Sequence, residues 1–142
     1  MAARPVFLDT NGWFAVLNQR DVLHAEANAR WHDLLRQGCI FAPTDWVIAE
    51  TGNGLARTPA RLQFTPAVRQ MRRSARFRVI SVDPILMERA LDLYADRPDQ
   101  TWGLVDCASF VAMKDEGITD AFTTDRHFEQ AGFNCLLPAS VA

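Results

Sequence analysis

Cysteine is scarce in this 142-residue sequence, and its three cysteines form no recognisable metal-binding or disulfide pattern. Cys39, Cys107 and Cys135 are widely spaced, and no CxxC pair occurs. Neither a zinc ribbon nor a disulfide framework is therefore indicated. Each cysteine has apolar neighbours, so we expect small, buried, unpaired side chains.

Long apolar runs are also missing. No stretch approaches 18 consecutive apolar residues, so we expect no membrane-spanning helix and no membrane partner. The N-terminal residues lead directly into a strand-like run, without the apolar core of a signal peptide. Together with the few cysteines, these features predict a cytoplasmic protein.

The charge is slightly negative overall but very uneven along the chain. The formal net charge is −2, yet residues 57–78 contain seven arginines and no acidic residue. A mildly acidic protein can therefore still present a basic face to a polyanion.

Short apolar runs that are typical of buried strands alternate with stretches in which apolar residues recur at helical spacing. The expected strands cover residues 5–8, 39–42, 79–82 and 121–124, and a weaker pattern at 135–137 favours an edge strand. The expected helices cover residues 13–17, 23–37, 46–50, 85–94 and 104–116, and a short helix is expected around Phe128. Thr44 or Asp45 is the expected cap of the helix at 46–50. This alternation predicts an α/β fold, with a central parallel sheet between two helical layers in a single domain over residues 1–142.

Carboxylates stand at positions where such a fold gathers its functional groups. Asp9 follows the first expected strand, Asp125 follows the fourth, and Asp106 lies in the first turn of the helix from residue 104. The carboxyl ends of parallel strands meet at one edge of the sheet, so these side chains are expected to lie close together. Glu50 lies in an unusually apolar helical stretch. Taken singly, the aspartates also fit helix caps or turns, and Glu50 fits a surface position.

Clustered carboxylates repel one another unless a cation neutralises them. A hard divalent ion with oxygen ligands meets that need, and Mg²⁺ or Mn²⁺ suits an all-carboxylate site better than Zn²⁺.

Four motifs in order resemble those of PIN domains. They are FLDTN at residues 7–11, TDWVIAE at 44–50, LVDCA at 104–108 and TTDRHF at 123–128. The resemblance extends over roughly residues 6–133, almost the whole chain. Each motif alone is weak evidence, but four in this order and spacing are specific.

The resemblance implies a PIN-like fold and a Mg²⁺- or Mn²⁺-dependent endoribonuclease similar to the VapC toxins of bacterial toxin–antitoxin pairs. Such an enzyme hydrolyses RNA phosphodiester bonds with metal-activated water, which we expect to leave 5′-phosphate and 3′-hydroxyl ends. The catalytic, metal-holding residues carried over from the family are Asp9, Glu50, Asp106 and Asp125. Supporting positions are Thr10, Asn11, Thr123 and, as an additional acidic residue before the third motif, Asp99. The resemblance also implies an antitoxin partner and a homodimer.

Arginines at helical spacing suggest how RNA binds. Arg69, Arg72, Arg73 and Arg76 are spaced 0, 3, 4 and 7, which predicts one shared helical face. Guanidinium groups bind phosphates in bidentate fashion and stack on bases. A solvated face, or a docking surface for an acidic partner, is the alternative interpretation.

Other functions explain the sequence less well. A haloacid-dehalogenase-like phosphohydrolase also opens with a strand ending in aspartate, but it needs a second aspartate two residues later, where this chain has Asn11. A non-catalytic PIN scaffold would not need all four carboxylates, whereas a non-toxin PIN nuclease in RNA processing stays open. We expect the three histidines, His24, His32 and His127, to be surface or structural residues.

Overall fold

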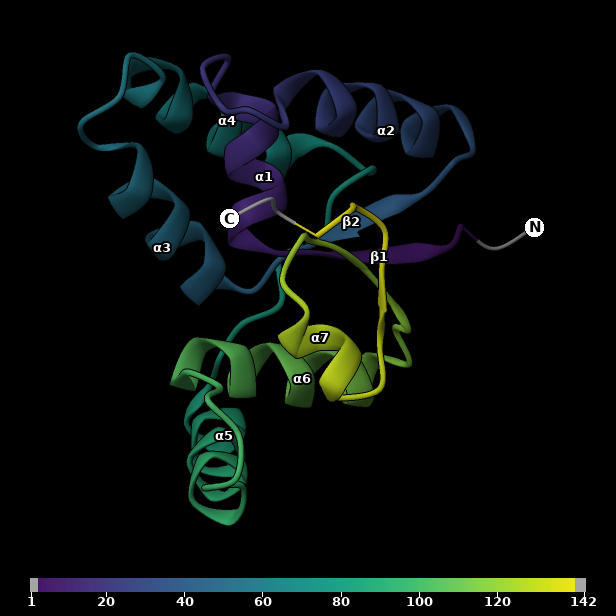
Figure 1. Cartoon of the computed structure of the whole chain (residues 1–142). Coiled ribbons are helices and arrows are strands. Elements are labelled where there is room, and N and C mark those ends of the chain that lie inside the picture. The colour runs from purple at the N-terminus through teal and green to yellow at the C-terminus, as the bar shows by residue number, and fades with distance from the viewer. Residues whose placement is uncertain (1–2, 140–142) are drawn as a thin grey trace.

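The computed structural model describes residues 3–139, in which one or more helices separate each strand from the next (Figure 1). The first half contains β1 (Pro5–Leu8), α1 (Thr10–Leu17), α2 (His24–Arg36), β2 (Ile40–Ala42), α3 (Asp45–Leu55) and α4 (Arg61–Arg73). The second half contains α5 (Pro84–Asp96), α6 (Leu104–Glu116), β3 (Asp120–Phe122), α7 (His127–Gln130) and β4 (Asn134–Cys135).

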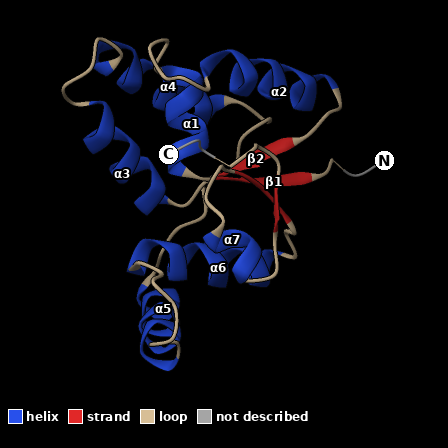
Figure 2. Cartoon of the chain, in the orientation of Figure 1, coloured by secondary structure: helices blue, strands red, loops and turns tan. Residues whose placement is uncertain are grey.

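The four strands form one parallel sheet in the order β2-β1-β3-β4. The central pair is in register at Phe7 with Ala121 and at Leu8 with Phe122, so β1 and β3 end side by side. Figure 2 shows helices on both sides of this sheet, and the predicted three-layer α/β/α fold is confirmed. Because all strands are parallel, their carboxyl ends share one edge, which is where the predicted site lies.

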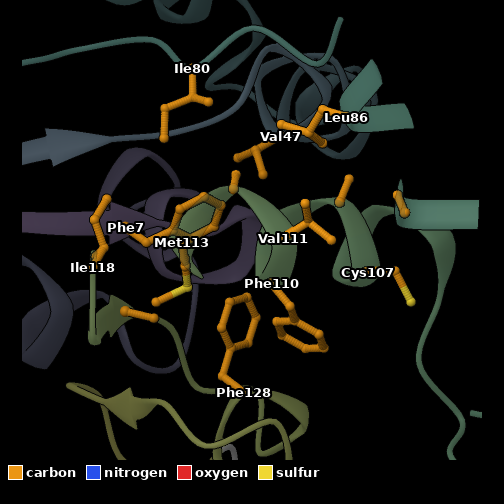
Figure 3. Packing of buried hydrophobic residues seen from close by; sticks show 14 of the residues in the cluster. Phe7, Val47, Ile80, Leu86, Cys107, Phe110, Val111, Met113, Ile118 and Phe128 are labelled. Carbon is orange, nitrogen blue, oxygen red and sulfur yellow. The ribbon is translucent and has the colours of Figure 1, made fainter. Parts of the chain in front are cut away.

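Alternate residues of β1 face two separate hydrophobic cores. Val6 and Leu8 pack with residues of α1, α2 and α4 on one face, while Phe7 packs with residues of α5, α6 and α7 on the other. Figure 3 shows the second core, in which the rings of Phe110 and Phe128 meet edge to face at 5.0 Å. A strand buried on both faces needs apolar residues throughout, which explains the continuous apolar run at the start of the sequence.

Local signals in the sequence set the ends of three helices. Thr44 caps α3, and its hydroxyl accepts a hydrogen bond from the Val47 amide at 3.1 Å. Asp83 caps α5 in the same way. At the end of α6, Gly117 adopts a left-handed conformation with φ of 67°, which glycine tolerates without strain.

The predicted strand at residues 79–82 is wrong. Within this segment Ile80 forms an isolated bridge with Thr44, and the preceding Phe77 forms another with Phe41 of β2. Pro43 lies between the two bridged residues of the neighbouring segment. Because proline has no backbone N–H to donate, the ladder is interrupted there and no regular strand forms.

Other predictions need smaller adjustments. The strand expected at 121–124 ends at Phe122, so Asp125 lies in the loop beyond it. The edge strand expected at 135–137 is the short β4. All three cysteines are free, with Cys39 and Cys107 buried and Cys135 partly buried. Within residues 3–139, no helix is both long enough and apolar enough to span a bilayer.

Candidate active site

Asp9 is the most deeply buried carboxylate at the edge where the strands end. It directly follows β1, occupies the position before the first residue of α1 without a capping hydrogen bond from its side chain, and is only 5% exposed. Burial raises its pKa from 3.8 to about 7, although hydrogen bonds from the Thr123 hydroxyl and the Thr10 amide work in the opposite direction. The negative charges of Asp106 and Asp125 raise the pKa of Asp9 further, so the three aspartates are close enough to interact electrostatically.

Thr123 connects this carboxylate to the rest of the edge. Its Oγ1 lies 2.8 Å from Asp9 Oδ2 and 2.9 Å from Asn11 Oδ1, and it accepts a hydrogen bond from the Asp125 amide at 3.0 Å. The Asn11 oxygen is held as an acceptor, because it also receives the Thr124 amide at 3.0 Å. One hydroxyl proton thus faces two acceptors. A proton on Asp9 resolves this shortage, which agrees with its raised pKa.

Asp106 and Asp125 meet around the imidazole of His127. Nδ1 of His127 lies 3.1 Å from Asp106 Oδ2 and 3.4 Å from Asp125 Oδ1. Asp106 is held at the start of α6 by the Gly103 amide, and Asp125 Oδ1 accepts the His127 amide at 2.9 Å. Burial raises the pKa of Asp106, against the hydrogen bond from His127. The ligand atoms of these three residues all lie within 4.8 Å of one another, close enough to hold one metal ion.

The acidic cluster (Asp9, Asp106 and Asp125) has no lysine or arginine counterion in the described part of the chain. The neighbouring Arg126 turns away and binds Glu129 and the Leu137 carbonyl. Three carboxylates without a fixed cation are costly when buried, and oxygen donors suit Mg²⁺ and Mn²⁺. The residues present therefore fit a divalent metal ion.

Two acidic residues predicted for the site lie outside the cluster. Glu50 is exposed on α3 and makes no hydrogen bond or ion pair within residues 3–139. Asp99 is exposed and forms a two-pronged ion pair with Arg97, which lowers the pKa of Asp99. Of the supporting residues, Thr123 contacts Asp9 and Asp125 directly, and Asn11 is connected to the cluster through Thr123. Thr10 offers its amide to Asp9, while its buried hydroxyl has no partner among the described residues.

The sequence interpretation missed the place of His127, which it treated as a surface or structural residue. The sequence feature that indicates a place near the carboxylates is the position of His127, two residues after Asp125 and at the start of a short helix. There, the backbone turn directs the ring back toward the carboxylates. Of the other histidines, His32 is exposed as expected, but the ring of His24 lies 2.8 Å from the Ala15 carbonyl and helps to join α2 to α1.

The arginine-rich segment does not form the single helical face that its spacing predicted. Arg69, Arg72 and Arg73 are exposed on α4 and form no ion pair in residues 3–139. Arg76 lies beyond the end of α4, which stops at Arg73. Its guanidinium instead binds the carbonyls of Leu35 and Cys39, at and just beyond the end of α2.

Comparisons with known proteins agree with this fold. Residues 6–134 match the model of the PIN domain. The 23S rRNA-specific endonuclease VapC20 of Mycobacterium tuberculosis is 29% identical over 128 residues, which cover 90% of this chain and 95% of VapC20. The crystal structure of VapC20, described as a toxin that cleaves the sarcin–ricin loop, superposes with a TM-score of 0.79 at 28% identity over 90% of this chain and 95% of that one. VapBC2 from Rickettsia felis, bound to a promoter DNA fragment, shares the fold with a TM-score of 0.65 at 16% identity, over 94% of this chain and 98% of that one.

Proposed function

This chain belongs to the PIN-domain family, and we propose that its acidic cluster is the active centre of a divalent-metal-dependent endoribonuclease. The PIN domain is a nuclease family and the curated relative is an endonuclease, so the enzyme class is a hydrolase of phosphodiester bonds. The observation that carries the proposal is the grouping of three carboxylates without a lysine or arginine counterion in residues 3–139. Asp106 and Asp125 lie on either side of the His127 ring nitrogen, and their charges raise the pKa of the buried Asp9.

Asp9, Asp106 and Asp125 would hold the ion, either Mg²⁺ or Mn²⁺. When bound, such an ion lowers the pKa of water and neutralises charge on the phosphate. Thr123 fixes the position of the Asp9 carboxylate through its hydroxyl, and Asn11 in turn binds Thr123. Oδ2 of Asp125 makes no hydrogen bond within residues 3–139, so it is available to take a proton from the attacking water. Glu50 is exposed on α3 and is the second candidate proton acceptor.

The relatives suggest the biological setting. VapC20 is a toxin that cleaves the sarcin–ricin loop of 23S rRNA, and VapBC2 is a toxin–antitoxin complex. By extension, this chain is the toxin of such a pair, with a cognate antitoxin protein, a homodimeric assembly and structured RNA as its substrate. Arg69, Arg72 and Arg73 supply exposed positive charge for the RNA backbone.

The test is cleavage of a sarcin–ricin loop oligonucleotide and of a shuffled control RNA by the purified chain, after EDTA dialysis and return of Mg²⁺ or Mn²⁺. We expect cleavage only with metal, and a loss of at least about 100-fold in D9N and D125N. The matched control is D99N, which removes an exposed carboxylate outside the cluster. The products should carry 5′-phosphate and 3′-hydroxyl ends.

Three results would contradict the proposal. A 2′,3′-cyclic phosphate product would mean that the RNA 2′-hydroxyl attacks in place of water. Equal activity of wild-type protein and D9N would mean that the acidic cluster is not the active centre. No cleavage of any RNA by a folded, metal-loaded chain would leave the fold as a binding scaffold.

A further inference from the structure

His127 brings a nitrogen donor to a site that otherwise offers oxygen. Its Nδ1 faces Asp106 Oδ2 at 3.1 Å and Asp125 Oδ1 at 3.4 Å. Two ligands at right angles around an ion with bonds of about 2.1 Å lie about 3 Å apart. The two distances from Nδ1 therefore match neighbouring ligands on one ion as well as they match hydrogen bonds.

The opposite side of the ring is held by a second residue. Nε2 of His127 lies 3.2 Å from Oγ1 of Thr101, in the loop that leads to α6. A histidine that binds a metal typically donates its other N–H to such a partner, which orients the ring and fixes its tautomer. If Thr101 accepts the Nε2 proton, the lone pair of Nδ1 points toward the two carboxylates. A hydroxyl can also reverse this bond and donate to Nε2 when Nδ1 carries the proton.

We propose that His127 Nδ1 is a ligand of the metal ion, together with Asp106 and Asp125, and that it shifts the preference of the site from Mg²⁺ toward Mn²⁺. The inference rests on the proposed function, because it concerns the same site. Mg²⁺ binds oxygen almost exclusively and keeps several waters, whereas first-row transition ions accept imidazole. A site with one nitrogen and several carboxylate oxygens therefore favours Mn²⁺ over Mg²⁺.

The test is pulsed electron paramagnetic resonance of Mn²⁺ bound to the full chain. We expect modulation from a directly bound ¹⁴N nucleus, which changes to a ¹⁵N pattern when the protein carries ¹⁵N-labelled histidine. In H127N the nitrogen signal should disappear. The matched control is H32N, because His32 is exposed on α2, away from the acidic cluster.

Metal affinities separate a ligand from a residue that only orients Asp106. Asparagine places an N–H donor close to the position of Nδ1, so H127N keeps the hydrogen bond to Asp106 but provides no imidazole nitrogen. Titration of the free Mn²⁺ signal, with Mg²⁺ as competitor, should show the Mn²⁺-over-Mg²⁺ preference falling about tenfold in H127N and remaining unchanged in H32N.

Each outcome bears on one claim. Mn²⁺ that binds without a ¹⁴N signal, or a preference that H127N leaves intact, overturns the role of His127 while the carboxylate site stands. Failure of the wild-type chain to bind either ion would instead remove the metal-dependent function on which the inference rests.

Discussion

The hydroxyl of Thr123 lies 2.8 Å from Oδ2 of Asp9, although 114 positions separate the two residues in the sequence. The bond joins the end of β1 to the segment that follows β3, at the edge where the two central strands finish side by side. Both residues are buried, so water cannot replace the bond easily. Thr123 is therefore a structural link between the first and fourth motifs.

Replacing Thr123 with valine, which has nearly the same shape, should weaken both folding and metal binding. The variant removes the hydroxyl bond to the buried Asp9 carboxylate, which keeps only the Thr10 amide, and deprives the Asp125 amide of its acceptor, at a cost of about 1–3 kcal/mol in unfolding free energy. Loss of the hydrogen bond also raises the pKa of Asp9 further, so less ionised carboxylate is present to bind metal at neutral pH. Chemical denaturation and Mn²⁺ titration measure the two effects. T119V, at an exposed threonine, should change neither; equal behaviour of the two variants would refute the link.

Stability of the metal-free protein should fall as pH rises. The pKa of Asp9 is raised from 3.8 to about 7, so the folded state binds its proton more tightly than the unfolded state does. The resulting stabilisation is fully present below about pH 4 and is lost as the pH rises through about 7. In EDTA we expect the unfolding free energy to drop by about 3 kcal/mol between pH 5 and pH 8 from this group alone. The raised pKa of Asp106 acts in the same direction.

The D9N variant isolates that contribution. Asparagine does not titrate, so the loss of stability between pH 5 and pH 8 should be clearly smaller in D9N. At pH 8, added Mn²⁺ should restore stability to the wild-type chain but much less to D9N, because the ion takes the place of the lost proton. If the unfolding free energy of the wild-type protein in EDTA did not change with pH, the pKa of Asp9 would not be raised by burial, and the prediction would fail.

Much of the fold can be predicted from the sequence because its signals are local. The continuous apolar run of β1 reflects burial on both faces, and Asp83 with Pro84 sets the start of α5. The strand predicted at 79–82 does not form because of a residue that is distant in sequence. Pro43 interrupts the hydrogen-bond ladder that this segment would join. Apolar patterning alone carries no information about such a missing partner.

The candidate site could be predicted only in part, for a similar reason. Asp9, Asp106 and Asp125 follow strand ends or begin a helix, so topology alone brings them together. Glu50 lies in an apolar stretch, yet the turn of α3 leaves its side chain exposed. His127 meets Asp106 across 21 residues, because the turn after β3 and the loop before α6 converge. The spacing of apolar residues in the sequence does not predict this contact between His127 and Asp106.

Glu50 should behave differently from the aspartates when its charge is removed. Because it is exposed and makes no ion pair within residues 3–139, E50Q should keep the Mn²⁺ affinity within about threefold of wild type. In D106N we expect that affinity to fall at least about tenfold, since a carboxylate of the cluster is lost. If Glu50 accepts a proton from water, E50Q lowers kcat without raising the metal requirement. A loss of Mn²⁺ affinity as large as that in D106N would instead make Glu50 a metal ligand.

The arginines should separate into two groups under substitution. Arg72 and Arg73 are exposed on α4, so R72A/R73A should weaken RNA binding and reduce the slope of log K against log salt by about 1–2, with unfolding free energy unchanged. Arg76 binds the Leu35 and Cys39 carbonyls around the end of α2, so R76A should lower stability and leave the salt slope nearly unchanged. Filter binding at several salt concentrations, with denaturation of each variant, measures both. If R72A/R73A keeps the wild-type slope, the exposed charge on α4 serves a partner other than RNA, and an acidic protein surface becomes the next ligand to test.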